Sequence, residues 1–222
     1  GSGAAGMTSA IELSKEFDIT LISKNTLVDS STWYAQGGIA AVIDEKDSTE
    51  DHLRDTLIAG DGLCNVEAVR ECVSKGKEAI DWLSDIGTSF TRDKSSNNYH
   101  LTQEGGHSKR RVVHSEDATG KEVSSSLAEI VRSISNIKVL ENHICVDLVT
   151  AKGRCVGAYV LDINTNEVKT FSSGSTIIAT GGASKIYLYT SNPDGSSGDG
   201  IGLAWRAGCK VENLEFNQFH PT

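Results

Sequence analysis

The chain opens with Gly1-Ser2-Gly3-Ala4-Ala5-Gly6 and continues directly into Met7-Thr8-Ser9-Ala10-Ile11-Glu12-Leu13. The second stretch has the apolar spacing of an amphipathic helix, so the residues before it are typical of a G-x-G-x-x-G turn. Such a turn needs glycine because the backbone bends sharply and approaches a pyrophosphate, which rests on the N-terminus of the helix. A flexible Gly-Ser terminus or an ordinary turn is the alternative.

Residues 19–23 form a short apolar run that suits a parallel strand covered on both faces. The strand that normally precedes the glycine turn is absent from the sequence, so we expect a fragment that lacks its first strand. An acidic residue usually follows such a turn by about 20 positions and binds a ribose. The strand here ends in Ser23-Lys24 instead, so a ribose contact would come from a hydroxyl or an amine.

The remaining pattern predicts an α/β, Rossmann-like domain with a parallel central sheet, helical insertions and a β-meander. We expect helices at about 48–59, 65–86, 119–134 and 200–207, meander strands at 137–140, 144–150, 155–162 and 167–171, and a buried strand at 175–180. Segment 29–43 shows neither the apolar periodicity of a helix nor that of a strand, and long irregular segments inside compact domains are usually functional. We expect residues 1–222 to form one incomplete domain.

The composition excludes several classes of protein. The 222 residues include 21 Lys and Arg against 30 Asp and Glu, a formal net charge of −9, so nucleic acid is a poor partner. The five cysteines show no Cys-x-x-Cys, so neither a disulfide framework nor a metal site is indicated. No run approaches a membrane span, and without a G-x-S-x-G motif Ser2 and Ser31 are not hydrolase nucleophiles. Arg110 and Arg111 are expected to be solvated.

A second strand ending is rich in glycine. Thr180-Gly181-Gly182 follows the apolar run 175–179, and a sheet that binds an extended cofactor presents several strand ends to it. The alternative is a tight turn without a ligand.

Five strings occur in order along the chain: Ser31-Thr32-Trp33-Tyr34-Ala35-Gln36-Gly37-Gly38-Ile39-Ala40-Ala41, His100-Leu101-Thr102-Gln103-Glu104-Gly105-Gly106-His107-Ser108, Ala179-Thr180-Gly181-Gly182-Ala183-Ser184-Lys185, Ser197-Gly198-Asp199-Gly200 and Glu215-Phe216-Asn217-Gln218-Phe219-His220-Pro221-Thr222. Together they resemble the flavoprotein subunit family of succinate dehydrogenase and fumarate reductase. The resemblance implies non-covalent FAD and, in the branch it matches best, oxidation of L-aspartate to iminoaspartate for NAD synthesis through quinolinate, with oxygen or fumarate as acceptor.

The resemblance also implies which residues contact FAD. They are Gly1, Ser2, Gly3, Ala4, Ala5 and Gly6 at the pyrophosphate, Lys24, the run Ser31, Thr32, Trp33, Tyr34, Ala35, Gln36, Gly37 and Gly38 along the flavin, then Cys145, Val146, Thr180, Gly181, Gly182 and Asp199. Relatives that attach FAD covalently carry a His immediately before Thr-x-x-Ala-Gln-Gly-Gly. This chain has Ser31 there, and a hydroxyl cannot form the histidyl bond.

Candidate substrate residues follow from the charges of aspartate, which has two carboxylates and an ammonium. Glu104 is the natural partner of the ammonium, whereas succinate would leave that carboxylate without one. Gln218 and His220 would donate to a substrate carboxylate, as the resemblance implies, and His107 shares the Glu104 loop; Glu104 and His220 are the expected catalytic residues. Alternatively, Glu104 is a surface carboxylate and His220 a packed loop residue. His52, His100, His114 and His143 are expected to be structural or exposed.

Two other functions stay open: a soluble fumarate reductase or succinate dehydrogenase flavoprotein, against which Ser31, Tyr34 and Glu104 argue, and a non-catalytic flavin-binding module. We expect small dicarboxylates (L-aspartate, fumarate) as partners, quinolinate synthase as a protein partner, and a cytoplasmic location, or a plastid in a plant. The resemblance implies that the capping domain, the helical domain and the remaining catalytic residues lie beyond residue 222, so this chain alone is expected to be inactive.

Overall fold

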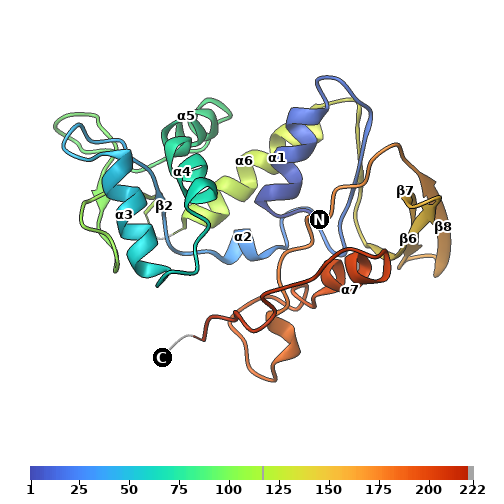
Figure 1. Cartoon of the computed structure of the whole chain (residues 1–222). Coiled ribbons are helices and arrows are strands. Elements are labelled where there is room, and N and C mark those ends of the chain that lie inside the picture. The colour runs from blue at the N-terminus through green and yellow to red at the C-terminus, as the bar shows by residue number, and fades with distance from the viewer. Residues whose placement is uncertain (117, 220–222) are drawn as a thin grey trace. The chain divides into compact units, whose positions relative to one another are not determined.

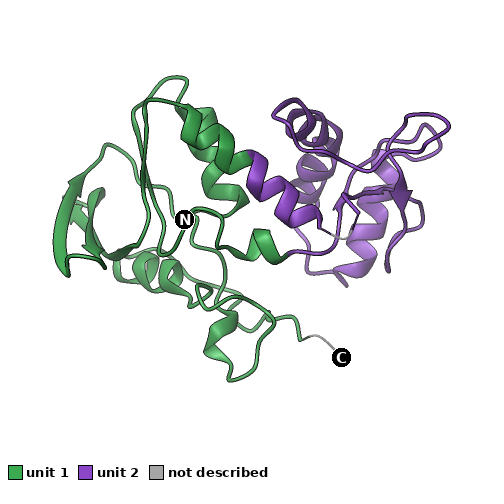
Figure 2. Cartoon of the chain, turned by 180° about the vertical axis from the view of Figure 1, so that it is seen from behind, with its two compact units in different colours: residues 1–34, 127–222 green, residues 35–126 purple. Residues whose placement is uncertain are grey.

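The computed structural model describes residues 1–116 and 118–219 (Figure 1). The chain divides into two compact units, one formed by residues 1–34 and 127–222 and the other by residues 35–126 (Figure 2). Each unit is described by itself below. No helix in the described ranges is both long and apolar enough to span a lipid bilayer.

The first unit begins with a helix and a parallel strand pair. Helix α1 (Ala4–Leu13) leads into β1 (Ile19–Ile22), which pairs in parallel with β5 (Ile137–Leu140). Apolar side chains of this region are buried, among them Met7, Ile11, Leu21 and Ile137. Burial of such side chains is the main term that stabilises a small α/β core. The predicted helix after the glycine turn and both predicted strands are confirmed.

The β-meander is confirmed for three of its four expected strands, whereas the expected strand at 137–140 pairs in parallel with β1 instead. Strands β6 (His143–Ala151), β7 (Arg154–Asp162) and β8 (Glu167–Ser172) form an antiparallel sheet in chain order. Asp162 closes the second turn, because its Oδ1 accepts hydrogen bonds from the backbone N–H groups of Asn164 and Thr165 at 3.0 and 3.4 Å. Asn166 then adopts a left-handed conformation with φ +57°, which asparagine tolerates better than most residues.

The predicted buried strand at 175–180 is wrong for the described residues. This segment pairs with no strand, and Ile177 and Ile178 are 55% and 39% exposed. A strand needs a neighbour for its N–H and C=O groups, and the parallel sheet among the described residues contains β1 and β5 alone. Segment 175–180 instead packs against Gly1, at which an added Cβ would lie 2.0 Å from the carbonyl oxygen of Ala179.

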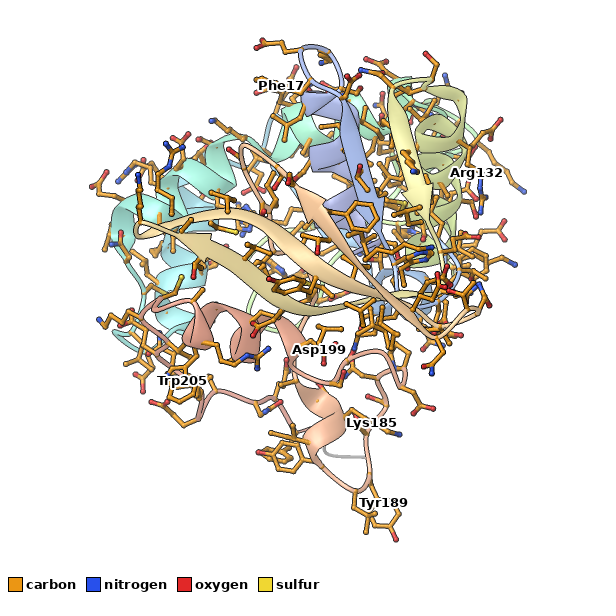
Figure 3. All side chains as sticks on the ribbon, turned by 90° about the vertical axis from the view of Figure 1, so that its right-hand side faces the viewer. Phe17, Arg132, Lys185, Tyr189, Asp199 and Trp205 are labelled. Carbon is orange, nitrogen blue, oxygen red and sulfur yellow. The ribbon has the colours of Figure 1, made fainter. Side chains whose placement is uncertain are left out.

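The last part of the first unit contains the helical turn η1 (Ser184–Ile186) and helix α7 (Asp199–Arg206). The predicted final helix is therefore confirmed. Figure 3 shows Asp199 at the beginning of α7, Trp205 near its end, and Tyr189 at the tip of the loop that precedes it. Leu188 and Tyr189 are 85% and 88% exposed, so this loop contributes nothing to the core of the unit.

The second unit combines three helices with a small sheet. The helices are α3 (Thr49–Ala59), α4 (Val66–Ser74) and α5 (Gly76–Asp85), and the strands β2 (Ile39–Ala40), β3 (Leu101–Thr102) and β4 (Val112–Val113) form an antiparallel sheet in the order β2-β4-β3. Ala41, Ile80, Phe90 and Val113 make its buried core. Helix α6 (Thr119–Ser133) contains the last residues of this unit and continues into the first.

Helix α3 begins as its sequence predicts, whereas the predicted single helix at 65–86 is wrong. The Oγ of Ser48 accepts a hydrogen bond from the N–H of Asp51, and the Oδ1 of Asn65 accepts one from the N–H of Ala68, so Ser48 and Asn65 are the N-caps of α3 and α4. The helix after Asn65 ends before Lys75, and α5 starts at Gly76. At Gly76 an added Cβ would lie 3.2 Å from the Cβ of Ala41, so tertiary packing determines the break.

Candidate functional site

The glycine turn presents the N-terminus of α1. Gly3 is the N-cap and has no side chain of its own to cap the helix. The N–H of Ala4 donates to Oγ1 of Thr32 at 3.0 Å, whereas the N–H groups of Ala5 and Gly6 have no acceptor within the described ranges. Helix N-termini of this kind bind anions, because free N–H groups and the helix dipole both favour negative charge.

Close packing explains two of the three glycines in this turn. A Cβ on Gly6 would lie 1.8 Å from the carbonyl oxygen of Gly1, a distance that no real side chain tolerates. The backbone of Gly1 in turn lies against Ala179. Ser2 is buried and its Oγ is 2.8 Å from the Oγ of Ser23, so the turn is tied to the end of β1.

Lys24, which follows β1, is paired with Asp199. Its Nζ lies 2.5 Å from Oδ2 of Asp199 and donates to Oγ of Ser197 at 2.5 Å and to the carbonyl of Gly195 at 3.1 Å. Burial raises the pKa of Asp199, but hydrogen bonds from Lys24 and Ser197 outweigh it and hold that pKa below its usual value. The structure therefore brings two predicted cofactor residues together, with their charges neutralised by each other.

Thr180, Gly181 and Gly182 lie against the beginning of α7. A Cβ on Gly200 would meet Oγ1 of Thr180 at 2.0 Å, and the N–H of Gly198 donates to the carbonyl of Gly182 at 3.1 Å. Gly181 and Gly198 have φ +72° and +78°, a conformation that favours glycine. The second predicted glycine turn thus forms even though segment 175–180 pairs with no strand among the described residues.

The segment after Ser30 forms a short helix, α2 (Ser31–Tyr34). The Oγ of Ser31 lies 2.9 Å from the Oγ of Ser196, and Tyr34 is 56% exposed. Ser30 has a buried Oγ with no hydrogen-bond partner among the described residues. A buried hydroxyl without a hydrogen-bond partner costs free energy, and a ligand or water that bonds to it would remove this cost. Trp33 follows in the same helix.

Cys145 and Val146 lie on β6, next to a register shift between Cys145 and Asp147. Burial raises the pKa of the Cys145 thiol, and its Sγ lies 3.7 Å from the carbonyl oxygen of Asp147. Arg206 of α7 donates to the carbonyl of Val146 and to Oδ1 of Asp147, both at 3.1 Å. These contacts fix the start of the meander beside α7.

In the second unit, residues 35–38 continue the predicted flavin segment. The carbonyl of Ala35 accepts a hydrogen bond from the N–H of Gly120 at 3.0 Å. Gly38 has no room for a side chain, since a Cβ there would lie 2.3 Å from the carbonyl oxygen of Val113. Gln36 and Gly37 are exposed, and a Cβ on Gly37 would lie 3.9 Å from Oε1 of Glu104.

Glu104 lies in the loop that joins β3 to β4. The loop is closed by Gln103, whose Nε2 donates to the carbonyl of His107 at 2.6 Å, and Gly106 turns it with φ +85°. The carboxylate of Glu104 is exposed and has no hydrogen-bond partner in the described part of the chain. The predicted ammonium partner therefore lies close to Gly37, a predicted flavin contact, with its acceptor oxygens available.

Sequence reasoning missed the buried charges beneath this loop. Arg111 is fully buried, which corrects its expected solvation, because Asp47 and Asp55 both bind its guanidinium. The pKa of Arg111 is raised, since these two carboxylates outweigh the cost of burial. His52 and His107 lie beside them with ring centroids 5.7 Å apart. The pairing could not be read from the sequence, because the partners lie 64 and 56 residues away.

The other predicted substrate residues are only partly described. Gln218 is exposed in the segment that follows α7, and the structure records no hydrogen bond of its side chain among the described residues. His220 lies outside the described residues. His100 and His114 pair with each other, Nδ1 to Nε2, at 2.8 Å.

The first unit combines two glycine turns, a helix N-terminus with free N–H groups and a parallel strand pair. These features together define an α/β protein that binds a nucleotide cofactor. The chain belongs to the FAD binding domain family, whose model matches residues 1–222, and FAD is its cofactor. The free N–H groups of α1 and the unpartnered Oγ of Ser30 fit a pyrophosphate-containing group.

Several curated relatives are named L-aspartate oxidase. The chain is 52% identical to the L-aspartate oxidase of Pseudomonas aeruginosa and 51% identical to L-aspartate oxidase 1 of Ralstonia nicotianae, over its whole length. It spans 44% and 43% of those proteins, somewhat less than half. Among solved structures, the quinol fumarate reductase FrdA of E. coli, in a mutant form, matches 93% of this chain and 36% of its own with a TM-score of 0.90 and 28% identity.

Proposed function

We propose that the protein containing this chain oxidises L-aspartate to iminoaspartate with FAD, as the first step of NAD synthesis through quinolinate, and passes the electrons to oxygen or fumarate. The observation that carries the proposal is the 52% identity, over the whole chain, to a protein named L-aspartate oxidase. The identity to the fumarate reductase structure is 28%.

The proposed binding of the cofactor uses both glycine turns. The N–H groups of Ala5 and Gly6 would hold the pyrophosphate, with Ser2 and Gly3 shaping the turn. Lys24 and Asp199 would act as one neutral pair near the far end of the cofactor. Thr180, Gly181, Gly182, Cys145 and Val146 would complete the contacts in the first unit. When bound, FAD supplies a two-electron acceptor.

The proposed substrate site assigns the ammonium of aspartate to Glu104. The exposed carboxylate has no hydrogen-bond partner among the residues that the structure describes, so it can accept hydrogen bonds from an ammonium. Gln218 and His220 would donate to a carboxylate of the substrate, and His107 would stand beside Glu104 in the same loop. In the reaction the Cα of aspartate gives up a hydride and its nitrogen a proton, and orientation by these side chains is what the protein contributes.

The flavin segment 31–38 favours non-covalent FAD. Ser31 stands where a histidyl attachment would need an imidazole, and its hydroxyl is already hydrogen-bonded to Ser196. We also retain the interpretation that residues 1–222 belong to one FAD-binding domain. Quinolinate synthase as partner and a cytoplasmic location belong to the same proposal; a related protein of Arabidopsis thaliana, 44% identical, is named chloroplastic.

The complete protein tests the proposal by anaerobic mixing with L-aspartate and, separately, with succinate, while the absorbance of oxidised flavin is followed. Bleaching by aspartate alone is the expected result. Bleaching by succinate would support the fumarate reductase and succinate dehydrogenase alternative, which the structural neighbour fits at 28% identity. A flavin band that neither substrate bleaches would support a non-catalytic flavin-binding module.

A further inference from the structure

The Glu104 loop has few internal supports. Among its described residues, the side-chain hydrogen bond from Gln103 to the carbonyl of His107 and one backbone turn, from the N–H of His107 to the carbonyl of Glu104 at 3.2 Å, close it. Gly105 and Gly106 lie between them. Since the carboxylate of Glu104 binds no protein group within residues 1–116 and 118–219, its direction depends on the backbone of this loop.

The loop is anchored from outside by one carboxylate. Both the N–H and the Oγ of Ser108 donate to Oδ2 of Asp55, at 2.8 and 2.7 Å. Asp55 belongs to α3, where it is 7% exposed. Burial raises the pKa of Asp55, but the hydrogen bonds from Ser108 and Arg111 outweigh it and lower that pKa to about 2. Asp55 is therefore an anion at neutral pH.

Arg111 holds that carboxylate in place. Its Nη1 donates to Oδ2 of Asp55 at 2.7 Å, while Nε and Nη2 donate to the two carboxylate oxygens of Asp47 at 2.8 Å each. The backbone of Arg111 is hydrogen-bonded on both sides: its N–H donates to the carbonyl of Thr102, and its carbonyl accepts from the N–H of Ala41. A guanidinium fixed by a bidentate carboxylate and by a sheet leaves Asp55 little freedom.

A buried histidine adds to this support. His52 is 6% exposed, its Nδ1 has no hydrogen-bond partner among the described residues, and its ring packs edge to face against His107 of the loop. The Nη1 of Arg111 also lies 3.5 Å from Nδ1 of His107. The loop thus contacts the same buried group at His107 and at Ser108.

We propose that Asp55, fixed by Arg111, is a positioning residue that holds the Glu104 loop and thereby aims the Glu104 carboxylate at the substrate ammonium. The inference rests on the proposed function for its substrate, and on the contacts of the second unit for its geometry. Asp55 touches no reacting atom in this scheme. It acts through Ser108, so its loss should affect an amino-acid substrate more than a dicarboxylate that has no ammonium.

The test uses the complete protein with Asp55→Asn, measured for aspartate oxidation, fumarate reduction and hydrogen exchange of the peptide 103–110. An asparagine keeps one acceptor for Ser108 but leaves Arg111 without this countercharge. We expect kcat/KM for aspartate to fall on the order of tenfold to a hundredfold, fumarate reduction to change by less than about twofold, and exchange of the peptide to become faster. Asp51→Asn is the matched control, since Asp51 lies on the same helix with its partner Arg54 at the surface.

A milder variant covers the case in which Asp55→Asn does not fold. Ser108→Ala removes one of the two hydrogen bonds to Asp55, so it should show the same selective loss at about threefold, and Ser108→Thr should restore activity. Proportional loss of both reactions with unchanged exchange would overturn the proposal, and so would behaviour equal to that of Asp51→Asn. Failure of the proposed function would appear differently, as a wild-type protein that does not oxidise aspartate. In that case, hydrogen exchange of peptide 103–110 in Asp55→Asn would still show whether Asp55 holds the loop.

Discussion

Glu104 combines an exposed carboxylate with a position beside Gly37. Under the proposed function, the choice between aspartate and succinate would depend on this carboxylate. Replacing Glu104 with Leu should lower kcat/KM for aspartate by about tenfold to a hundredfold, the usual loss for one hydrogen bond to a charged group. Fumarate reduction should be unchanged or faster, because fumarate has no ammonium. Steady-state kinetics with both substrates check this on the complete protein.

The reverse result would contradict the assignment of the ammonium. If aspartate oxidation survives Glu104→Leu while fumarate reduction falls, another group binds the ammonium. Glu67→Leu is a suitable control, since Glu67 is an exposed carboxylate in the first turn of α4, away from the loop.

Gly6 offers a second prediction at the residue scale. Alanine favours helices over glycine by about 1 kcal/mol, so Gly6→Ala within α1 would ordinarily stabilise the helix. The added Cβ would lie 1.8 Å from the carbonyl oxygen of Gly1, so the turn must open. We expect most of the FAD to be lost during gel filtration, as measured by the ratio of flavin to protein absorbance. Gly174→Ala, where a Cβ meets nothing, should retain FAD fully.

At the scale of single residues, the sequence predicts the functional loops better than the buried charges that hold them. Glu104 could be selected because its charge belongs to a single residue, and Gly37 and Gly38 because they belong to a string that resembles the family. The burial of Arg111 could not be predicted, because it depends on Asp47 and Asp55, which only the folded second unit brings to it.

Among the elements, α4 depends on its N-cap. Asn65→Ala removes the side-chain acceptor for the N–H of Ala68, which should cost about 1 kcal/mol. Asn65→Asp should cost little, because aspartate caps equally well. Urea unfolding of the complete protein, followed by the circular dichroism signal of the helices, should show a lower midpoint for Asn65→Ala than for Asn65→Asp. Equal midpoints would mean that packing alone holds α4.

Elements with a clear local pattern could be predicted, and those fixed by tertiary contacts could not. The meander follows from alternation and from a turn closed by Asp162. The strands β2, β3 and β4 are two residues long each and carry no periodic signal. The break between α4 and α5 depends on the approach of Gly76 to Ala41, and segment 175–180 has the composition of a strand without a described partner.

For the molecule as a whole, buried titratable groups of the second unit predict a loss of stability in acid. Burial lowers the pKa of His52, and Arg111 and His107 lower it further against the opposing effect of Asp47 and Asp55. The pKa of His52 in the folded protein therefore lies below the unfolded value of 6.5. Its contribution to the free energy of unfolding is complete above about pH 6.5 and is lost as the pH falls. Asp55 adds a second decline between about pH 3.8 and about pH 2.

Urea midpoints measured from pH 7.5 to 5 check the first decline. His52→Phe removes the titrating group but keeps an aromatic ring against His107, so the variant should lose less stability over this range than the wild type. A parallel decline in both proteins would assign the acid sensitivity to other histidines. His143→Phe, a substitution in β6 of the first unit, is the control for that assignment.

The hydroxyl of Ser31 has a practical consequence for the whole protein. Its Oγ is engaged with Ser196 and it offers no imidazole, so in the proposed mode of binding Ser31 forms no covalent bond to the isoalloxazine ring. The apoprotein should therefore accept synthetic flavins of higher or lower midpoint potential, so that the driving force of the reaction can be varied while every amino acid stays in place.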